Sequence, residues 1–357
     1  MSEFARSTLV AFEEQVRGLG KPCRNLLRAM VLFEALKAHG VRYIPDANTP
    51  YTKVSADRSV VDHISYPAEV LQQKAGDCDD LTVLYCSLLE NAGVSTALVD
   101  APGHIFLLFD TGVSRQEVYK LPIDEKLYLI RGDRVWVPLE VTLVGEGFAR
   151  AWQAGAEELV KVRAERERVV DTQAAWEMYA PASPVFAEKG SVPTKEMMQE
   201  GVKGQYAALE EQIDTYIEQT YLYPLKTHPD NAALWSELAR VYVGLGRYDT
   251  AIKLAYSRLT EKEGEDATTF NQLGIAHYLK GDLEQAGYFF KKAVELAPDD
   301  KKMRGNLDKA LGALGKGEGL KGKPPAGAAG NEELGTEEVG AKAGQVEVDE
   351  DSFYWRE

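Results

Sequence analysis

Cysteine is scarce in this chain. Among 357 residues the cysteines are Cys23, Cys78 and Cys86, an odd number without a Cys-x-x-Cys pair. Such a set supplies neither a disulfide framework nor a cysteine-based zinc site, so nothing in the sequence requires an oxidising compartment. Cys86 follows Cys78 by eight residues within one expected helix and is interpreted as a buried packing thiol.

A long apolar run is also lacking. No stretch approaches the ~18 apolar residues of a membrane span. The first residues, MSEFARSTLVAFEEQV, carry acids and lack the apolar core of a signal peptide. We therefore expect a cytoplasmic protein without a membrane partner, or a periplasmic one if the chain is a fragment of a longer exported protein.

Positive charge is in deficit, because 41 Lys and Arg residues face 56 Asp and Glu residues and leave a net charge of −15. This balance argues against binding to nucleic-acid phosphates or to anionic membranes. The expected partners are a protein or peptide substrate and a protein partner. The length allows two or more domains, and 45% hydrophobic residues are ordinary for a globular protein.

The sequence does contain a helix start that carries a thiol. Residues 76–93, GDCDDLTVLYCSLLENAG, place apolar residues at three- and four-residue steps, which predicts an amphipathic helix that ends at Gly93. Asp77 is suited to cap its first turn. Cys78 then lies at the positive end of the helix dipole, which favours a nucleophilic thiolate, although apolar burial would oppose it.

Two later segments carry a base and an acid. Residues 102–109, PGHIFLLF, predict a buried strand with His104 at its start, and residues 136–142, WVPLEVT, predict a strand with Glu140 near its far end. A nucleophilic thiol needs a neighbouring base, and the base needs an acceptor that orients it. Cys78, His104 and Glu140 supply these roles in that order.

These three motifs together resemble the transglutaminase-like superfamily, which includes bacterial transglutaminase-like cysteine proteinases. The resemblance covers roughly residues 25–152, under half of the chain. It implies an α+β, papain-like cysteine hydrolase domain with a catalytic triad of Cys78, His104 and Glu140. The family usually has Asp in the third position, and Glu is one methylene longer. The implied activity is that of a peptidase, an amidase or a transglutaminase-like acyltransferase, without a cofactor or a metal.

An acyl-transfer site also needs donors for the oxyanion. The backbone amide of Cys78 is one candidate, and the side chains of Gln72, Gln73 and Tyr66 are others. They lie just upstream of the expected helix. The sequence does not choose among them.

The acids around Cys78 have two interpretations. Asp77, Asp79 and Asp80 are preferred as cap and first-turn partners of the helix dipole. They could instead contribute to a cation site, as in some related proteinases that use calcium. Their negative charge would in either case oppose a thiolate at Cys78.

After Gly93 the pattern predicts short strands, at 95–99, 105–109, 126–130 and 135–141, with a turn over 131–134. A helix that begins near Phe148 is expected to cover this sheet. The charged residues 161–168 are interpreted as solvated. Helices followed by an antiparallel sheet indicate an α+β layer.

The second half contains a repeat. The matching pairs, each 35 residues apart, are Trp235 and Phe270, Leu238 and Leu273, Tyr242 and His277, Gly246 and Gly281, and Ala251 and Ala286. This pattern resembles the tetratricopeptide repeat, whose period is about 34. Residues 301–314 are expected to form a capping helix, and the repeats a short groove for a protein partner.

The predicted domains are a transglutaminase-like domain at 1–182, a linker at 183–204, a repeat domain at 205–315 and a disordered, acidic and Gly-rich tail at 316–357. Two functions remain open. One is a cysteine-dependent acyl-transfer enzyme whose repeats hold a partner. The other is a catalytically inactive scaffold for protein–protein interaction.

Overall fold

The computed structural model describes residues 2–12, 24–45, 64–101, 103–163, 168–180, 191–261 and 266–315. The chain divides into two compact units, Met1–Tyr223 and Pro224–Glu357. The first unit mixes helices with an antiparallel sheet, and the second is helical throughout its described residues, which confirms the predicted order of the two fold types. Within the described ranges, no helix is both long enough and apolar enough to span a membrane. The predicted tail at 316–357 lies outside these ranges.

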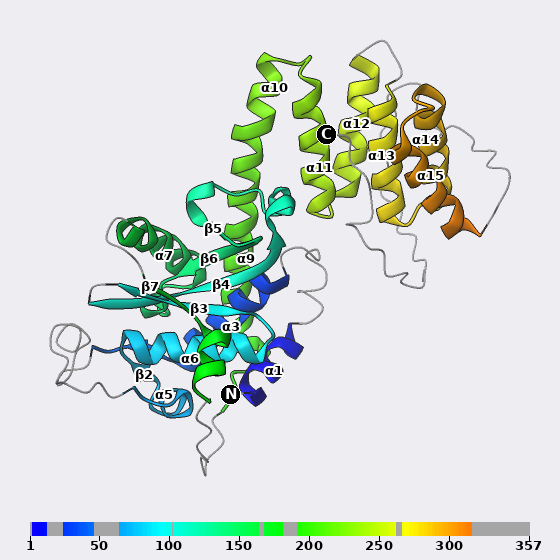
Figure 1. Cartoon of the computed structure of the whole chain (residues 1–357). Coiled ribbons are helices and arrows are strands. Elements are labelled where there is room, and N and C mark those ends of the chain that lie inside the picture. Colours follow the sequence, from blue (N-terminus) through cyan, green and yellow to red (C-terminus); the bar gives the residue numbers. More distant parts are fainter. Residues whose placement is uncertain are drawn as a thin grey trace. The chain divides into compact units, whose positions relative to one another are not determined.

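In the described residues, five strands form one antiparallel sheet at the centre of the first unit (Figure 1). The order of the strands across the sheet is β5-β6-β4-β3-β7. The strands are β3 (Thr96–Ala101), β4 (His104–Ser114), β5 (Leu129–Arg131), β6 (Arg134–Leu139) and β7 (Arg168–Asp171). Because Ala101 pairs with His104 across the β3–β4 hairpin, the histidine begins the central strand.

The sheet differs from its prediction in extent. Strand β4 continues to Ser114 through an irregular register after Asp110, where Arg134 Nε donates to an Asp110 carboxylate oxygen at 3.0 Å. The predicted strand at 126–130 is divided into the turn η3 (Glu125–Leu127) and β5. Strand β7 begins at Arg168, the last residue of the segment interpreted as solvated, and it pairs with β3, with Leu98 opposite Val170. The prediction did not include this four-residue strand, which pairs with the edge of β3.

Helices cover both faces of the sheet. They are α3 (Arg24–His39), α6 (Cys78–Asn91) and α7 (Phe148–Arg163). Helices α3 and α6 contact β4, and the Phe33 ring of α3 meets Tyr85 of α6 edge-on at 5.5 Å. On the other face, Leu159 and Val162 of α7 join Phe106 and Trp136 in a buried cluster. Alternate residues of the strands thus serve two cores, as the period of two requires.

Short elements complete the first unit. They are α1 (Ser2–Ala11), β1 (Arg42–Tyr43), α5 (Pro67–Gln73), β2 (Ala75–Gly76), η2 (Arg115–Lys120), η4 (Val141–Leu143) and α8 (Thr172–Met178). Strands β1 and β2 form a small parallel pair in which Tyr43 lies opposite Gly76. This pairing brings Tyr43 beside the start of α6, although 35 residues separate it from Cys78 in the sequence.

A long helix crosses the boundary predicted between the linker at 183–204 and the repeat domain. Helix α9 (Lys195–Ile217) packs on α3 and α7, and it leads into the π-helical turn η5 (Glu218–Leu222) and α10 (Tyr223–Thr227). Its buried residues have helical spacing: Met198, Val202, Leu209, Ile213 and Ile217. The first unit therefore extends to Tyr223, beyond the predicted limit at 182. Residues 183–190 of the predicted linker lie outside the described ranges.

A buried glutamate joins three helices of the first unit. Glu34 of α3 is 2% exposed and accepts from the backbone N–H of Phe148, the first residue of α7, at 3.0 Å. A Cβ on Gly201 of α9 would lie 2.7 Å from the Glu34 carboxylate, so α9 approaches it closely. Burial raises the pKa of Glu34, and the Phe148 hydrogen bond and Lys37 oppose this effect.

We expect the substitution Glu34→Gln to remove one source of pH-dependent stability. Because the pKa is raised in the folded state, the stabilising contribution of protonated Glu34 is complete below its unfolded pKa and is lost as pH rises through its folded value. The variant should therefore gain stability relative to wild type as pH rises from about 4 towards neutrality. Urea unfolding over this range measures the difference. Glu200→Gln, at an exposed position, is the control, and parallel curves for Glu34→Gln and wild type would contradict the argument.

The second unit is a series of antiparallel helical hairpins. Its helices are α11 (Ala232–Gly244), α12 (Tyr248–Glu261), α13 (Ala267–Lys280), α14 (Leu283–Leu296) and α15 (Lys301–Leu314). Gly281 adopts a φ of +94° and ends α13, as a helix C-terminus favours. Helices α13 and α14 pack so closely that a Cβ on Gly274 would lie 2.5 Å from the Phe290 ring. The buried Asn306 donates to Asn271 at 2.9 Å and joins the final helix to α13.

Candidate active site

Cys78 is the first residue of α6, and its local sequence explains how the helix starts there. Gly76 lets β2 pass close to the first turn, since a Cβ on it would lie 2.7 Å from the Cβ of Asp80. Asp77 caps the helix by accepting from the backbone N–H of Asp80 at 3.3 Å. The Cys78 side chain is 6% exposed and free of any disulfide. The thiol thus lies at the positive end of a capped helix, in a largely buried position.

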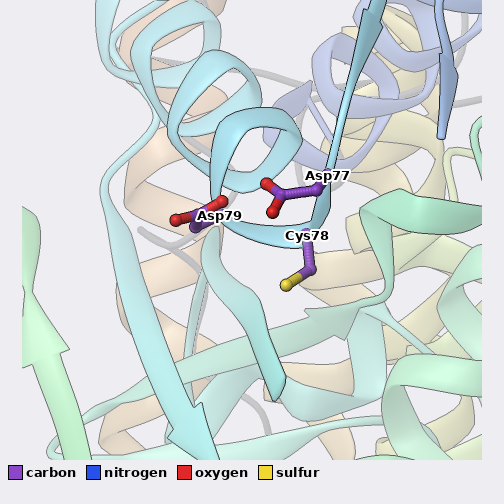
Figure 2. A group of neighbouring side chains, drawn as sticks. All are labelled: Asp77, Cys78 and Asp79. Carbon is purple, nitrogen blue, oxygen red and sulfur yellow. The ribbon is translucent and has the colours of Figure 1, made fainter. Parts of the chain in front are cut away.

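Two carboxylates flank this thiol. One ligand atom from each of Asp77, Cys78 and Asp79 lies within 4.8 Å of the others. In Figure 2 the Cys78 sulfur and the two carboxylates point in different directions from the helix start. Asp77 and Asp79 both accept from the N–H of Asp80, and Asp80 accepts from Ser65 N at 2.6 Å. These hydrogen bonds support the interpretation of the acids as caps of the first turn.

His104 begins strand β4 beside α6. Thr82, one turn after Cys78, is fully buried and donates to the carbonyl of Ile105 at 3.4 Å, which ties the two elements together at this level. The His104 ring stacks on Phe106 at a centroid distance of 6.3 Å. Its side chain is 29% exposed, so one part of the ring remains accessible to solvent.

Glu140 follows β6 and is 5% exposed. Its Oε1 accepts from the backbone N–H of Thr142 at 3.1 Å and from the Thr142 hydroxyl at 2.5 Å. Its own backbone N–H donates to the carbonyl of Ala151 in α7 at 3.0 Å. The carboxylate is therefore held by its own turn, and the backbone of that turn is held by α7.

The structure brings the imidazole and the carboxylate into direct contact. His104 Nε2 lies 2.5 Å from Glu140 Oε2. Burial alone would lower the pKa of His104, but hydrogen bonds to Cys78 and Glu140 and the negative charge of Glu140 raise it to about 10. Since Glu140 uses Nε2, Nδ1 is the ring nitrogen left for the sulfur. The raised pKa keeps the His104 ring cationic at neutral pH, beside the Cys78 sulfur.

The three side-chain oxyanion candidates lie on or next to α5. Tyr66 precedes the helix, is 41% exposed, and donates its backbone N–H to Glu69 at 2.8 Å. Gln72 and Gln73 occupy the exposed end of α5 and are separated from Cys78 by β2. These positions provide no geometric preference for any of the three as an oxyanion donor. The backbone N–H of Cys78 lies in the first turn of α6, where N–H groups have no partner within the helix.

Sequence reasoning missed two residues at this site. One of them is Tyr43, which the β1–β2 pairing places near Cys78. Burial raises the pKa of its phenol, and the nearby Cys78, Asp77 and Glu140 raise it further. Nothing in the short segment around Tyr43 indicates this position. Thr142 was within the motif that resembles the superfamily, and its spacing of two from Glu140 could have suggested a side-chain turn.

Comparisons with known proteins concern the second unit. A model of the tetratricopeptide repeat matches residues 218–268 and 237–301. The chain thus carries tetratricopeptide repeats at 218–301, and such repeats imply protein partners. The match does not reach Cys78, His104 or Glu140. A search of curated proteins finds no match to the chain.

Proposed function

We propose that the first unit is a cysteine-dependent acyl-transfer enzyme of the transglutaminase-like type, acting as a peptidase or amidase on a protein or peptide. The observation that carries the proposal is the contact of 2.5 Å between His104 Nε2 and Glu140 Oε2. The His104 imidazole is partly accessible, contacts a buried carboxylate through one nitrogen and is hydrogen-bonded to the Cys78 thiol. Such an arrangement activates a nucleophile.

In the first half-reaction, the Cys78 sulfur adds to the carbonyl carbon of an amide. The carbonyl oxygen becomes an oxyanion, towards which the backbone N–H of Cys78 is a natural donor. The His104 imidazolium then gives its proton to the departing amine as the carbon–nitrogen bond breaks. The products are a thioester on Cys78, a free amine and a neutral imidazole. Glu140 keeps the ring oriented throughout and stabilises its cationic form.

In the second half-reaction, the neutral His104 removes a proton from water or from a second amine. The resulting nucleophile adds to the thioester carbonyl, and the carbon–sulfur bond breaks to leave the Cys78 thiolate beside an imidazolium. Water gives hydrolysis and an amine gives transamidation. Both outcomes use the same three side chains, so the site chemistry is compatible with either.

The repeats support a protein rather than a small molecule as the partner. Stacked helical hairpins build extended surfaces for polypeptide chains. We infer that the second unit binds the substrate protein or a protein that accompanies it. Net negative charge on the chain disfavours a nucleic-acid partner.

Labelling of Cys78 tests the enzyme proposal, because the chain contains a matched control thiol. A peptide epoxide should modify Cys78, and Cys78→Ser should lower the labelling rate by about 100-fold or more. Cys86 is 5% exposed, and burial raises its pKa to about 12, so Cys86→Ser should label like wild type. Peptide mass mapping assigns the modified residue and separates any modification of Cys23. Equal labelling of wild type and Cys78→Ser would refute the proposal.

A second candidate function is a catalytically inactive scaffold, and the tetratricopeptide match favours it. The two proposals differ in what the thiol does. A scaffold would bind its partner equally well with Cys78→Ser and would form no thioester with an activated ester. An enzyme would form that thioester on Cys78, and intact-mass spectrometry would detect it.

A further inference from the structure

Tyr43 is a side chain of the candidate site to which the two half-reactions assign no role. It lies in β1 and is 42% exposed. Between residues that the structure describes, no hydrogen bond involves its hydroxyl. A phenol O–H both donates and accepts hydrogen bonds, so this group is available to a bound molecule.

The backbone of β1 fixes the side of the strand on which Tyr43 projects. The N–H groups on either side of Tyr43 donate to carbonyls of the segment 74–76, at 3.0 and 2.9 Å. Tyr43 lies opposite Gly76 in this pairing, so both residues project to the same face of the strand pair. A Cβ on Gly76 would meet Asp80 of α6. This face is therefore directed towards the helix turn that carries Cys78.

The turn η4 borders the same place. It contacts both β1 and α6, and Glu140 is its N-cap. Strand β1 thus neighbours the turn that carries the acid and, through β2, the start of the helix that carries the thiol. The electrostatics of Tyr43 agree with this placement. Burial raises the pKa of its phenol, and the charges of Cys78, Asp77 and Glu140 raise it further, so the phenol is a protonated donor at neutral pH.

Addition of the Cys78 sulfur to an amide places negative charge on the carbonyl oxygen, which hydrogen-bond donors stabilise. The backbone N–H of Cys78 supplies one donor from α6. The side chains on and next to α5 are not favoured by their geometry, whereas the Tyr43 hydroxyl comes from a separate element next to Cys78 and Glu140. Two donors from different elements can hold the oxygen from two directions.

We propose that Tyr43 is a further catalytic residue, whose hydroxyl donates a hydrogen bond to the carbonyl oxygen of the scissile amide alongside the backbone N–H of Cys78. The bond strengthens as the carbon–sulfur bond forms and the carbonyl electron pair moves to the oxygen. Tyr43 keeps its proton throughout, and the carbonyl re-forms when the carbon–nitrogen bond breaks. This role rests on the proposed acyl transfer by Cys78.

The test compares acylation with alkylation of the same thiol in the full-length protein. Tyr43→Phe removes the hydroxyl and keeps the ring at a partly exposed position, so the fold should be retained, and circular dichroism checks this. Acetylation of Cys78 by p-nitrophenyl acetate, followed by peptide mass mapping, should slow by about 100-fold. Alkylation of Cys78 by iodoacetamide should change by less than about threefold, because displacement of iodide forms no oxyanion. Tyr179→Phe, which removes a hydroxyl from a 75% exposed tyrosine beyond α8, is the matched control and should react like wild type.

The possible outcomes separate this role from the enzyme proposal. Acetylation of Cys78 at the wild-type rate in Tyr43→Phe would overturn the role and leave acyl transfer standing. Equal slowing of acetylation and alkylation would also overturn it, because Tyr43 would then act on the thiol. A larger loss of acetylation in Tyr66→Phe would assign the donor to the start of α5 instead. Wild-type protein that is alkylated but never acetylated at Cys78 would refute the enzyme proposal and this role with it.

Discussion

Replacing Glu140 with glutamine is expected to lower the pKa of His104 from about 10. The proton affinity of the ring should fall at least tenfold. The substitution removes a negative charge 2.5 Å from Nε2 and leaves an amide of nearly the same shape. It also allows the amide nitrogen to face the ring, which can reverse the direction of the hydrogen bond. We therefore expect labelling of Cys78 at neutral pH to slow by about 100-fold or more.

An NMR titration of the His104 ring measures the first effect, with His104→Asn to assign the resonance. The stability of the fold provides an independent check. Because the folded pKa of His104 is raised, its stabilising contribution is complete below the unfolded pKa of about 6.5 and is lost as pH rises through about 10. The difference in unfolding free energy between wild type and Glu140→Gln should shrink over that range.

The matched control retains the charge. Glu140→Asp shortens the side chain by one methylene, and the family resemblance makes Asp the usual residue at this position. We expect it to preserve a raised pKa at His104 better than Glu140→Gln does. An unchanged His104 titration in Glu140→Gln would show that the carboxylate does not control the imidazole.

Replacing Gly155 with alanine is expected to produce the largest loss of stability. A Cβ at this position would lie 2.7 Å from the backbone nitrogen of Leu139 and from the carbonyl carbon of Pro138. Both are backbone atoms of β6, a strand within the sheet, so they cannot move aside as a flexible side chain can. Helix α7 must shift instead, at a cost of about 2–3 kcal/mol or more. Thermal unfolding of the first unit should then begin several degrees lower.

The same shift should reach the site through Glu140. Its backbone N–H is bound to the carbonyl of Ala151, one turn before Gly155, so movement of α7 displaces the acid that orients His104. Slower labelling of Cys78 should accompany the loss of stability. Gly204→Ala, in α9, is the control, because its Cβ meets no atom within 4 Å. That substitution should stabilise the helix by up to about 1 kcal/mol. Wild-type stability in Gly155→Ala would contradict the packing argument.

The local geometry at Cys78 could be predicted from the sequence because it depends on neighbours in the chain. Apolar spacing predicts α6, Asp77 predicts its cap, and the position of Cys78 at the first turn follows from both. The hairpins of the second unit could likewise be predicted from pairs 35 residues apart, and the match to the tetratricopeptide repeat confirms them. Repeats can be predicted from the sequence because each copy contacts mainly the next one.

Other features could not be predicted because their cause lies in a distant segment. Strand β7, only four residues long, was not predicted, and it is held by its pairing with the edge of β3. Helix α9 belongs to the first unit because its apolar residues are buried against α3 and α7, whereas the preceding prolines suggested a linker. Tyr43 lies near Cys78 because β1 pairs with β2.

The sequence alone determined that the chain places a thiol on a helix start, a histidine at the start of a strand, and repeats of helical hairpins in its second half. It predicted Glu140 within a strand, whereas β6 ends at Leu139 and Glu140 precedes η4. Only the tertiary structure decided that His104 and Glu140 meet. The physical reason is one of range. Hydrogen bonding and apolar spacing along a few residues fix each element, but the register between strands and the packing of helices fix which side chains share a site.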